Sequence, residues 1–361
     1  MAYNTSLNAA RSVKNDEFYT RYEDIEREME AYLAYNPRLF HGKTVLLPCD
    51  DYKRSNFVRY FSQNFSRFGL AGLAATSYQA DGRGQCSIIG KGFPIYGDAG
   101  QGILSSDGDF RSDEISSLRD YADLVITNPP FSLFREFLAW IVEAGKKFAV
   151  IGNMNAITYK EVFPLIKDNK VWLGATNFNV GMYFFVPKGF VYKDSYKFIR
   201  EMDGKAVNRV PGVCWYSNIE HGRRHEPLAL MSMADNLRFS KHKELKGKTA
   251  YDRYDNYDAI EVPFTDAIPS DYDGVMGVPI SFLDKYCPEQ FEILGMCENE
   301  DLYSMKTRVY TTYECKTAYL KKFGKTGTYD LNASGVITRN GIQEKVYQRI
   351  LIINRKFAPN S

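Results

Sequence analysis

Apolar residues along the first half of the chain follow two alternating patterns. Short continuous apolar runs predict buried strands at 44–47, 73–76, 123–127 and 148–151. Between them, apolar residues recur every three or four positions, which predicts helices. The most regular such stretch comprises Leu133, Phe134, Phe137, Leu138, Ile141 and Val142. Strands that alternate with helices predict a mostly parallel α/β sheet covered by helices.

The pattern changes further along the chain. β-type segments at 171–173, 182–186 and 213–216 follow the alternating part, and they predict that the sheet ends in an antiparallel hairpin. Beyond about residue 235 the chain becomes rich in Tyr, Asp, Gly and Pro, and the elements it predicts are short. We therefore expect one domain over 1–235 and a smaller α+β region over 236–361, which suits a length of 361 residues.

One motif at the end of a predicted strand carries chemistry. Asn128, Pro129, Pro130 and Phe131 directly follow the apolar run at 123–127. The prolines fix φ and lack N–H donors, so this backbone is stiff and presents carbonyl oxygens. The asparagine side chain adds another acceptor, and the phenylalanine offers a flat face for stacking. This combination suits a planar amino group on a ring or an amide, although a plain strand-to-helix turn is the alternative.

Composition narrows the class of protein. Hydrophobic residues make up 44% and charged residues 25%, which argues against a disordered chain. No apolar run is long enough for a transmembrane helix, and no secretory signal pattern is present. The six cysteines are widely spaced, without a Cys-x-x-Cys pair, as in reduced cytosolic proteins. We therefore expect a cytoplasmic protein that does not associate with membranes.

Several segments, including the motif at 128–131, resemble N6-adenine DNA methyltransferases, most closely the EcoRI modification methylase family. The matching segments are 15–20, 50–51, 55–57, 108–110, 128–135, 151–157, 215–224 and 275–282. The resemblance implies a Rossmann-like class I methyltransferase sheet, mostly parallel and seven-stranded, with an antiparallel hairpin. It also implies methyl transfer from S-adenosylmethionine to N6 of an adenine flipped out of duplex DNA.

The resemblance assigns catalytic roles to the motif that ends the fourth strand. Asn128 and the Pro129 carbonyl would hold the adenine amino group, with Pro130 completing the rigid turn. Phe131 would stack on the flipped base. No metal is required.

The resemblance also assigns residues to the cofactor. Phe18, Tyr19 and Thr20 resemble the segment that covers its methionine end, and Asp109 and Phe110 would contact its adenine. A second group follows the first strand and comprises Cys49, Asp50 and Asp51. The glycine-rich turn usual at that point is missing, and 76–79 holds no acid to grip the ribose. The alternative, without the resemblance, is that these carboxylates cap the helices that follow them.

Charge by segment indicates where DNA would bind. Residues 1–251 hold 33 basic and 28 acidic side chains, 252–303 hold 2 and 13, and 304–361 hold 11 and 3. The overall charge of +2 therefore conceals a strongly basic C-terminal segment, where aromatics lie among the lysines. We predict DNA contacts at Arg223, Arg224, Lys321 and Lys322, with a solvated basic face as the alternative. The acidic segment should face away from DNA or pack against the basic tail.

Other functions stay open at this stage. The same motif would also serve methylation of an amino or amide group in RNA or protein, and a catalytically silent DNA-binding homologue is a third reading. The resemblance implies double-stranded DNA as the partner. It allows a cognate restriction endonuclease that acts separately, and we expect a monomer.

Overall fold

The structure is a computed structural model that describes residues 19–80, 82–94, 101–176, 178, 181–185, 199–202, 205–210 and 212–358. It divides into two compact units, Met1–Gly222 and Arg223–Ser361. The expected division at 235/236 therefore falls inside the second unit. That expected division concerns function, and it stays a prediction.

An eight-stranded sheet forms the centre of the first unit, in the order β5-β4-β3-β2-β6-β7-β12-β8. The central strands β3, β2, β6 and β7 are parallel, whereas β4 and β12 run antiparallel to their neighbours. The strands are β2 (Thr44–Leu47), β3 (Gly72–Ser77), β4 (Gln85–Gly90), β5 (Gln101–Ile103), β6 (Leu124–Thr127), β7 (Lys147–Asn153), β8 (Trp172–Leu173) and β12 (Val213–Ser217). This confirms the mostly parallel sheet and its antiparallel ending. The ending is not the expected hairpin, because β8 and β12 are not consecutive strands and the segment predicted at 182–186 belongs to a separate sheet. The described strands number eight rather than seven, because the short β5 adds an edge.

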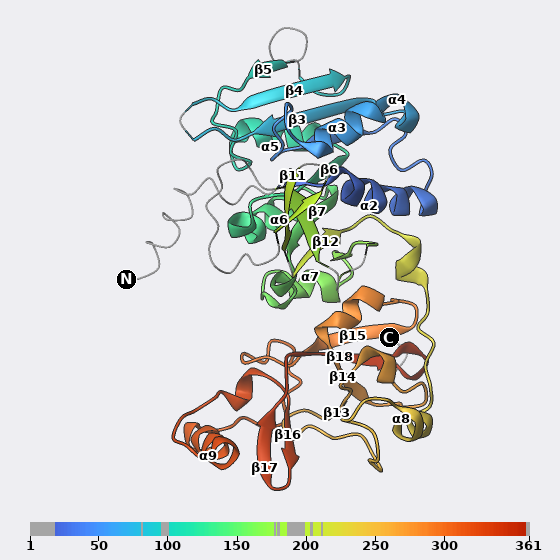
Figure 1. The fold of residues 1–361 in the computed structure, drawn as a ribbon, viewed down its shortest axis with the longest axis vertical. Helices are drawn as coiled ribbons and strands as arrows, with labels where there is room; N and C mark the ends of the chain where they lie inside the picture. The colour runs from blue at the N-terminus through green and yellow to red at the C-terminus, as the bar shows by residue number, and fades with distance from the viewer. Residues whose placement is uncertain are drawn as a thin grey trace. The chain divides into compact units, whose positions relative to one another are not determined.

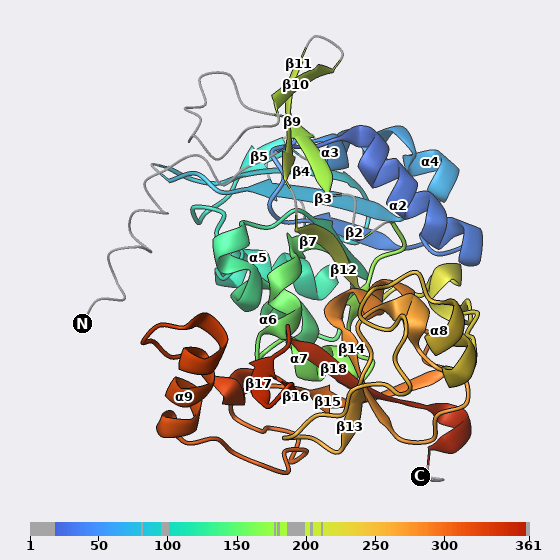
Figure 2. The same ribbon diagram turned by 60° about the horizontal axis from the view of Figure 1, so that its bottom comes forward.

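Helices cover both faces of this sheet. Figure 2 shows α2, α3 and α4 on one side of it and α5 and α6 on the other. The first group is α2 (Tyr22–Tyr35), α3 (Asn56–Gln63) and α4 (Phe65–Phe68); the second is α5 (Asp113–Tyr121) and α6 (Phe134–Glu143). Aromatic residues of α3 and α4 pack with Val45, Leu73 and Ile126 of the strands in one continuous core. Serine caps begin α3 and α5, where the Ser55 and Ser112 hydroxyls accept from backbone N–H groups.

A second, smaller sheet belongs to the first unit and has the order β1-β9-β11-β10. Its strands are β1 (Tyr19–Thr20), β9 (Met182–Phe185), β10 (Ile199–Met202) and β11 (Lys205–Val210). The Asn56 side chain donates to the carbonyl oxygen of Thr20 at 2.8 Å. Because Asn56 is the first residue of α3, this bond ties β1 to the start of that helix. Short helices η2 (Phe131–Leu133), η3 (Met154–Thr158) and α7 (Phe163–Lys167) complete the described part of the unit.

The second unit is α+β, as its sequence predicts. A four-stranded sheet has the order β13-β14-β18-β15, and β16 and β17 form a separate pair (Figure 1). The strands are β13 (Ala259–Glu261), β14 (Val275–Pro279), β15 (Phe291–Met296), β16 (Val336–Arg339), β17 (Ile342–Lys345) and β18 (Arg349–Asn354). The helices are η4 (Gly222–His225), α8 (Met233–Phe239), η5 (Thr265–Ala267), η6 (Ile280–Lys285), α9 (Thr312–Phe323), η7 (Leu331–Ala333) and η8 (Arg355–Phe357). Asn340 and Gly341 turn the β16–β17 hairpin with φ of 51° and 72°, as tight hairpin turns require.

Two general properties follow from the described residues. None of their helices is both long and apolar enough to cross a membrane. All six cysteines are thiols rather than disulfides, and five of them are buried.

Candidate active site

Strand β6 brings the motif at 128–131 to the carboxyl edge of the large sheet. All four residues of β6 are buried between β2 and β7, and Asn128 follows them directly. Asn128 is half-buried and Pro129 is buried. The Pro130 carbonyl accepts from the backbone N–H of Leu133 at 3.0 Å, which closes the η2 turn. The motif is therefore fixed on one side by a buried strand and on the other by a hydrogen-bonded turn.

Phe131 begins η2 and is half-buried. Its ring packs against the core formed by α2, α3 and the strands, so one part of the side chain is anchored while another part stays accessible. Tyr22, Tyr52 and Met182 are partly buried against the same core. The stacking role of Phe131 stays a prediction.

Asp50 lies at the end of β2 and is the central polar group of this edge. Its carboxylate accepts from the Ser55 hydroxyl at 2.5 Å and from the Thr127 hydroxyl at 2.6 Å. The Asp50 side chain is buried, and its backbone N–H donates to the carbonyl of Thr76 at 2.8 Å. Burying a carboxylate is costly unless hydrogen bonds satisfy it, and the two hydroxyls meet this need. Asp50 thus links the ends of β2, β3 and β6.

Thr127 was not singled out by the sequence, although it precedes Asn128 directly. A hydroxyl residue at the end of an otherwise apolar strand is the signal that could have indicated it. The Thr127 hydroxyl donates to Asp50, a predicted cofactor residue, and Thr127 is followed directly by Asn128, a predicted catalytic residue. Thr127 therefore connects the two predicted groups.

Cys49 and Asp51, which flank Asp50 in the sequence, have different surroundings from it. The Asp51 side chain turns back to its own loop, where it accepts from the backbone N–H of Lys53 at 2.8 Å and lies 3.9 Å from the Arg54 guanidinium. Cys49 is half-buried. Asp51 therefore supports the turn, and the cofactor roles of Cys49 and Asp51 stay predictions.

The start of the described chain lies beside this turn. Tyr19 and Thr20 form β1, and Asn56 connects Thr20 to the beginning of α3. The Thr20 hydroxyl is buried, and it makes no hydrogen bond within the described part of the chain. Phe18 lies outside the described residues, and the structure describes the backbone of Tyr19 but not its side chain.

The loop before α5 holds the other two predicted cofactor residues. Asp109 is half-buried and pairs with Arg111, whose guanidinium also reaches Glu136 at 2.9 Å. The hydrogen bond to Asp109 raises the pKa of Arg111 further above its already high value. Phe110 is buried with its ring centroid 4.9 Å from that of Phe137. The structure therefore shows a salt bridge and core packing here, and cofactor contacts by Asp109 and Phe110 stay predictions.

Close backbone packing fixes that loop against the end of β3. Gly108 has φ of +84°, and a Cβ atom there would lie 2.4 Å from the carbonyl oxygen of Ser77. The Gln79 N–H also donates to the Asp107 carbonyl at 2.8 Å. Ser77 thus lies between the Asp50 turn and the Asp109 loop, and its hydroxyl is buried without a hydrogen-bond partner in the described residues. The sequence drew no attention to Ser77, since the expected residue was an acid.

The predicted DNA contacts in the second unit have different surroundings. The Arg223 guanidinium pairs with Asp284 at 2.6 Å, and Arg224 is buried with its guanidinium 5.9 Å from the Tyr286 ring centre. Lys322 lies 3.5 Å from Glu344, whereas the exposed Lys321 has no acidic partner in the described residues. A buried or paired cation is a poor phosphate contact, so we keep Lys321 as the strongest of these predictions.

The acidic segment packs against the basic tail, which confirms one of the two arrangements expected for it. Three ion pairs join the segments: Asp252 with Arg339, Glu261 with Arg349, and Glu292 with Arg355. The Glu261–Arg349 pair is buried, with a closest approach of 2.6 Å. Much of the positive charge of the tail is therefore neutralised inside the second unit.

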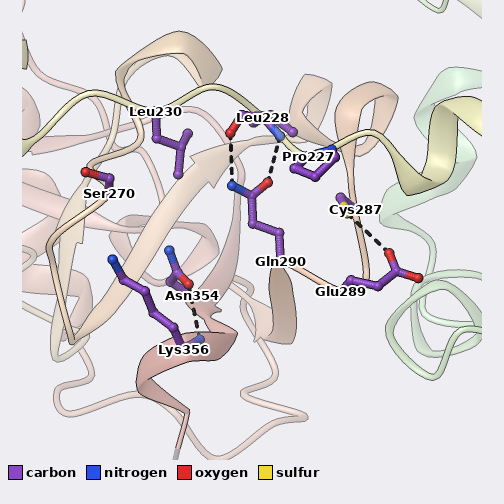
Figure 3. Close-up of a pocket in the computed structure, with 9 residues that line it drawn as sticks. All are labelled: Pro227, Leu228, Leu230, Ser270, Cys287, Glu289, Gln290, Asn354 and Lys356. Atoms are coloured by element: carbon purple, nitrogen blue, oxygen red, sulfur yellow. Dashed lines mark hydrogen bonds between the residues drawn. The ribbon is translucent and has the colours of Figure 1, made fainter.

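A shallow cavity of about 500 Å³ also lies in the second unit (Figure 3). Its lining comprises Pro227, Leu228, Leu230, Ser270, Cys287, Glu289, Gln290, Asn354 and Lys356. The Gln290 amide is hydrogen-bonded to the backbone of Leu228, and burial raises the pKa of the Cys287 thiol. The Gln290 and Cys287 side chains of this lining therefore make structural contacts within the unit. No cluster of His, Cys, Asp and Glu suited to a metal ion occurs in the described ranges.

The chain is similar to known proteins over most of its length. The family model described as "Adenine-specific methyltransferase EcoRI" matches residues 6–356. The Type II methyltransferase M.EcoRI of Escherichia coli is 40% identical over 318 residues, which cover 83% of this chain and 91% of that protein. The Type II methyltransferase M.MpnI of Mycoplasma pneumoniae is 35% identical, over 84% of this chain and 90% of that protein. No solved structure matches the chain significantly.

The match covers both units and nearly the whole length of these relatives. It agrees with the mostly parallel sheet of the first unit. The chain therefore belongs to the EcoRI family of adenine-specific methyltransferases, and it is a site-specific DNA adenine methyltransferase.

Proposed function

We propose that this enzyme transfers a methyl group from S-adenosylmethionine to N6 of an adenine flipped out of duplex DNA, at the carboxyl edge of its large sheet. The observation that carries the proposal is the 2.6 Å hydrogen bond from Thr127 to the buried Asp50 carboxylate. Asp50 belongs to the predicted cofactor side, and Thr127 directly precedes Asn128 on the predicted amine side. The two halves of the reaction thus share one rigid edge, as in-line transfer requires.

The residues of this edge fit S-adenosylmethionine, which supplies an electrophilic methyl group. The hydroxyls of Thr20 and Ser77 are buried and lack hydrogen-bond partners among the described residues. Such groups cost free energy until a ligand satisfies them. The buried Asp50 carboxylate adds a negative charge that favours a positively charged ligand. Ser77, between the Asp50 turn and the Asp109 loop, is our candidate for the sugar contact that the sequence leaves unassigned.

On the amine side, the Asn128 side-chain oxygen and the Pro129 carbonyl accept the two hydrogens of the adenine amino group. Bonding both hydrogens turns the nitrogen lone pair out of the ring system, so that N6 can attack the methyl carbon. The carbon–sulfur bond would break as the nitrogen–carbon bond forms, leaving a neutral thioether, and N6 would then lose one proton to solvent. Phe131 stacks on the base and offsets part of the cost of flipping it, which is a few kcal/mol.

Several wider features belong to the same proposal. Residues 1–235 carry cofactor binding and catalysis, and 236–361 carry target recognition. The enzyme acts as a cytoplasmic monomer on double-stranded DNA. The curated relatives are named Type II methyltransferases, so a separate restriction endonuclease is the partner that this proposal suggests.

Transfer of a radiolabelled methyl group tests the proposal. Wild-type protein should label duplex DNA, with N6-methyladenine as the product after nuclease digestion. Asn128→Ala should lose about a hundredfold or more in transfer rate, the scale seen when one electrostatic contact to a reacting group is removed, and should bind S-adenosylmethionine nearly as before.

The matched control is Asn64→Ala, at the opposite end of α3 from Ser55. It removes the same side chain from a helix C-cap and should retain transfer. Label in RNA or protein but not in DNA would overturn the proposed substrate. An Asn128→Ala enzyme as active as Asn64→Ala would overturn the role of Asn128.

A further inference from the structure

Helix α9 packs against a small, separate hydrophobic cluster in the second unit. Thr311 and Glu314 form a reciprocal capping box at its start, and Gly324 ends it in the left-handed conformation. One face, with Cys315 and Ala318, is buried in a cluster with Tyr310, Leu331 and Val336. Figure 1 shows β16 and β17 beside the helix. The helix is thus rigidly held from one side.

Ion pairing leaves several lysines on and just after this helix without an acidic partner. The arginines at 339, 349 and 355 pair with the acidic segment, and Arg308 pairs with Glu314 at 2.5 Å. By contrast Lys316, Lys321 and Lys325 are exposed and lack an acidic partner among the residues that the structure describes. Among the described residues of the tail, Lys345 and Lys356 are also exposed and lack an acidic partner, so three of these five lysines lie on α9 or just after it.

The exposed face of α9 has an ordered layout. At 3.6 residues per turn, Tyr313, Thr317 and Leu320 lie within about 60° of one another and form a central row. Lys316 lies about 60° to one side of Tyr313, and Lys321 about 80° to the other. The exposed fractions of Tyr313 and Leu320 are 78% and 49%, so both side chains are accessible to a ligand. A row of uncharged side chains thus lies between two lysines.

We propose that α9 is the sequence-reading helix of this enzyme and lies in the major groove of DNA. This inference rests on the proposed function and specifies how its substrate is selected. A helix with side chains is about 10–12 Å across, and the major groove is about 12 Å wide. Phosphates line both edges of the groove and base edges form its floor, which matches lysines on both flanks and an uncharged row in the centre.

The two kinds of residue have separable roles. Lys316 and Lys321 contact phosphates and supply affinity that depends on salt but not on sequence. Tyr313, Thr317 and Leu320 meet base edges, where the hydroxyls can hydrogen-bond and the apolar parts can contact a thymine methyl group. Changes in the central row should therefore alter which sequence is methylated, whereas changes on the flanks should alter binding to every sequence.

Two sets of variants of the full chain test this inference. For the flanks, Lys316→Glu with Lys321→Glu should raise the Kd for duplex DNA about tenfold or more and flatten its salt dependence by about 2 in slope. The control is Lys241→Glu with Lys285→Glu, which changes two exposed lysines of the same unit and gives the same net charge. For the central row, Tyr313→Ala and Leu320→Ala should relax the methylated motif at one or two positions, as mapped by sequencing N6-methyladenine in plasmid DNA.

The outcomes separate this inference from the proposed function. If the wild type methylates DNA while the flank variants match their control and the row variants keep the motif, α9 is not the reading helix. If the wild type binds DNA without methylating it, the proposed function fails, and the salt slope still decides the role of α9. Tighter binding of an acidic protein or RNA than of DNA, with all of it lost in the flank variants, would overturn DNA as the occupant.

Discussion

Charged side chains have opposite surroundings at the carboxyl edge of the large sheet and on the exposed face of α9. At the edge, the Asp50 carboxylate is buried and held by two hydroxyls at 2.5 and 2.6 Å. On α9, Lys316 and Lys321 extend into solvent without an acidic partner in the described part of the chain. Catalytic groups must be held in place before the substrate binds. Groups that contact DNA must instead be exposed, so that they can exchange water and counterions for phosphate. If both proposals hold, this difference separates catalysis from recognition within one chain.

The strongest test of this comparison changes two adjacent carboxylates at the edge of the sheet, Asp50 and Asp51. Asp50→Asn keeps the shape but removes a buried charge, and we expect methyl transfer to fall about a hundredfold, mainly through weaker S-adenosylmethionine binding. Asp51→Asn is the matched control, because the Asp51 carboxylate bonds only to its own loop in the contacts described above. Titration calorimetry with the cofactor and single-turnover transfer measure both variants. Equal losses in the two would mean that burial does not set the role of Asp50.

Sequence reasoning predicted the sheet and placed the motif at 128–131 and Asp50 at the ends of strands, because each leaves a local signal. Apolar runs followed by polar residues mark strand ends, and two prolines after a strand allow few conformations. It did not reach Thr127 or Ser77, whose importance comes from neighbours on other strands. Nor did it distinguish Lys321 from Lys322, since an ion pair with Glu344 depends on where β17 lies. A hydrophobic pattern along the sequence does not show contacts between residues that are far apart in the chain.

A smaller effect on cofactor affinity is expected at Ser77. It tests whether this hydroxyl is held in place for the ligand rather than for the fold. Ser77→Ala removes a buried hydroxyl that has no described partner, so the free energy of unfolding should stay the same or rise by up to about 1 kcal/mol. Affinity for S-adenosylmethionine should nonetheless fall about fivefold, the value of roughly one hydrogen bond. Urea unfolding and calorimetry give the two quantities.

Ser217 supplies the control for that change. Its buried hydroxyl donates to the Phe148 carbonyl at 2.8 Å, so Ser217→Ala should lower the free energy of unfolding by about 1 kcal/mol and leave cofactor affinity unchanged. If Ser77→Ala behaves like Ser217→Ala, the Ser77 hydroxyl has a structural role, and the proposed sugar contact is wrong.

The smallest effect concerns the loop that carries Asp109. Burial alone would raise the pKa of Glu114, but hydrogen bonds from the backbone N–H groups and hydroxyls of Ser105 and Ser106 outweigh it and hold that pKa below its ordinary value. The folded protein therefore binds fewer protons than the unfolded chain in this range. The stabilisation from Glu114 is complete above the unfolded value of about 4.3 and is lost as the pH falls through the lower folded value.

Glu114→Gln should thus destabilise the protein by about 0.5–1 kcal/mol at pH 7, and the difference from wild type should shrink below about pH 4. Unfolding in urea across this pH range measures it, with Glu136→Gln as a control on the same side of the sheet, since Glu136 meets Arg111 at the surface. A difference that is constant with pH would show that the carboxylate charge does not hold the loop. Such a loop would depend on the close contact of Gly108 with Ser77 instead, and the first unit would then rely on backbone packing more than on buried charge.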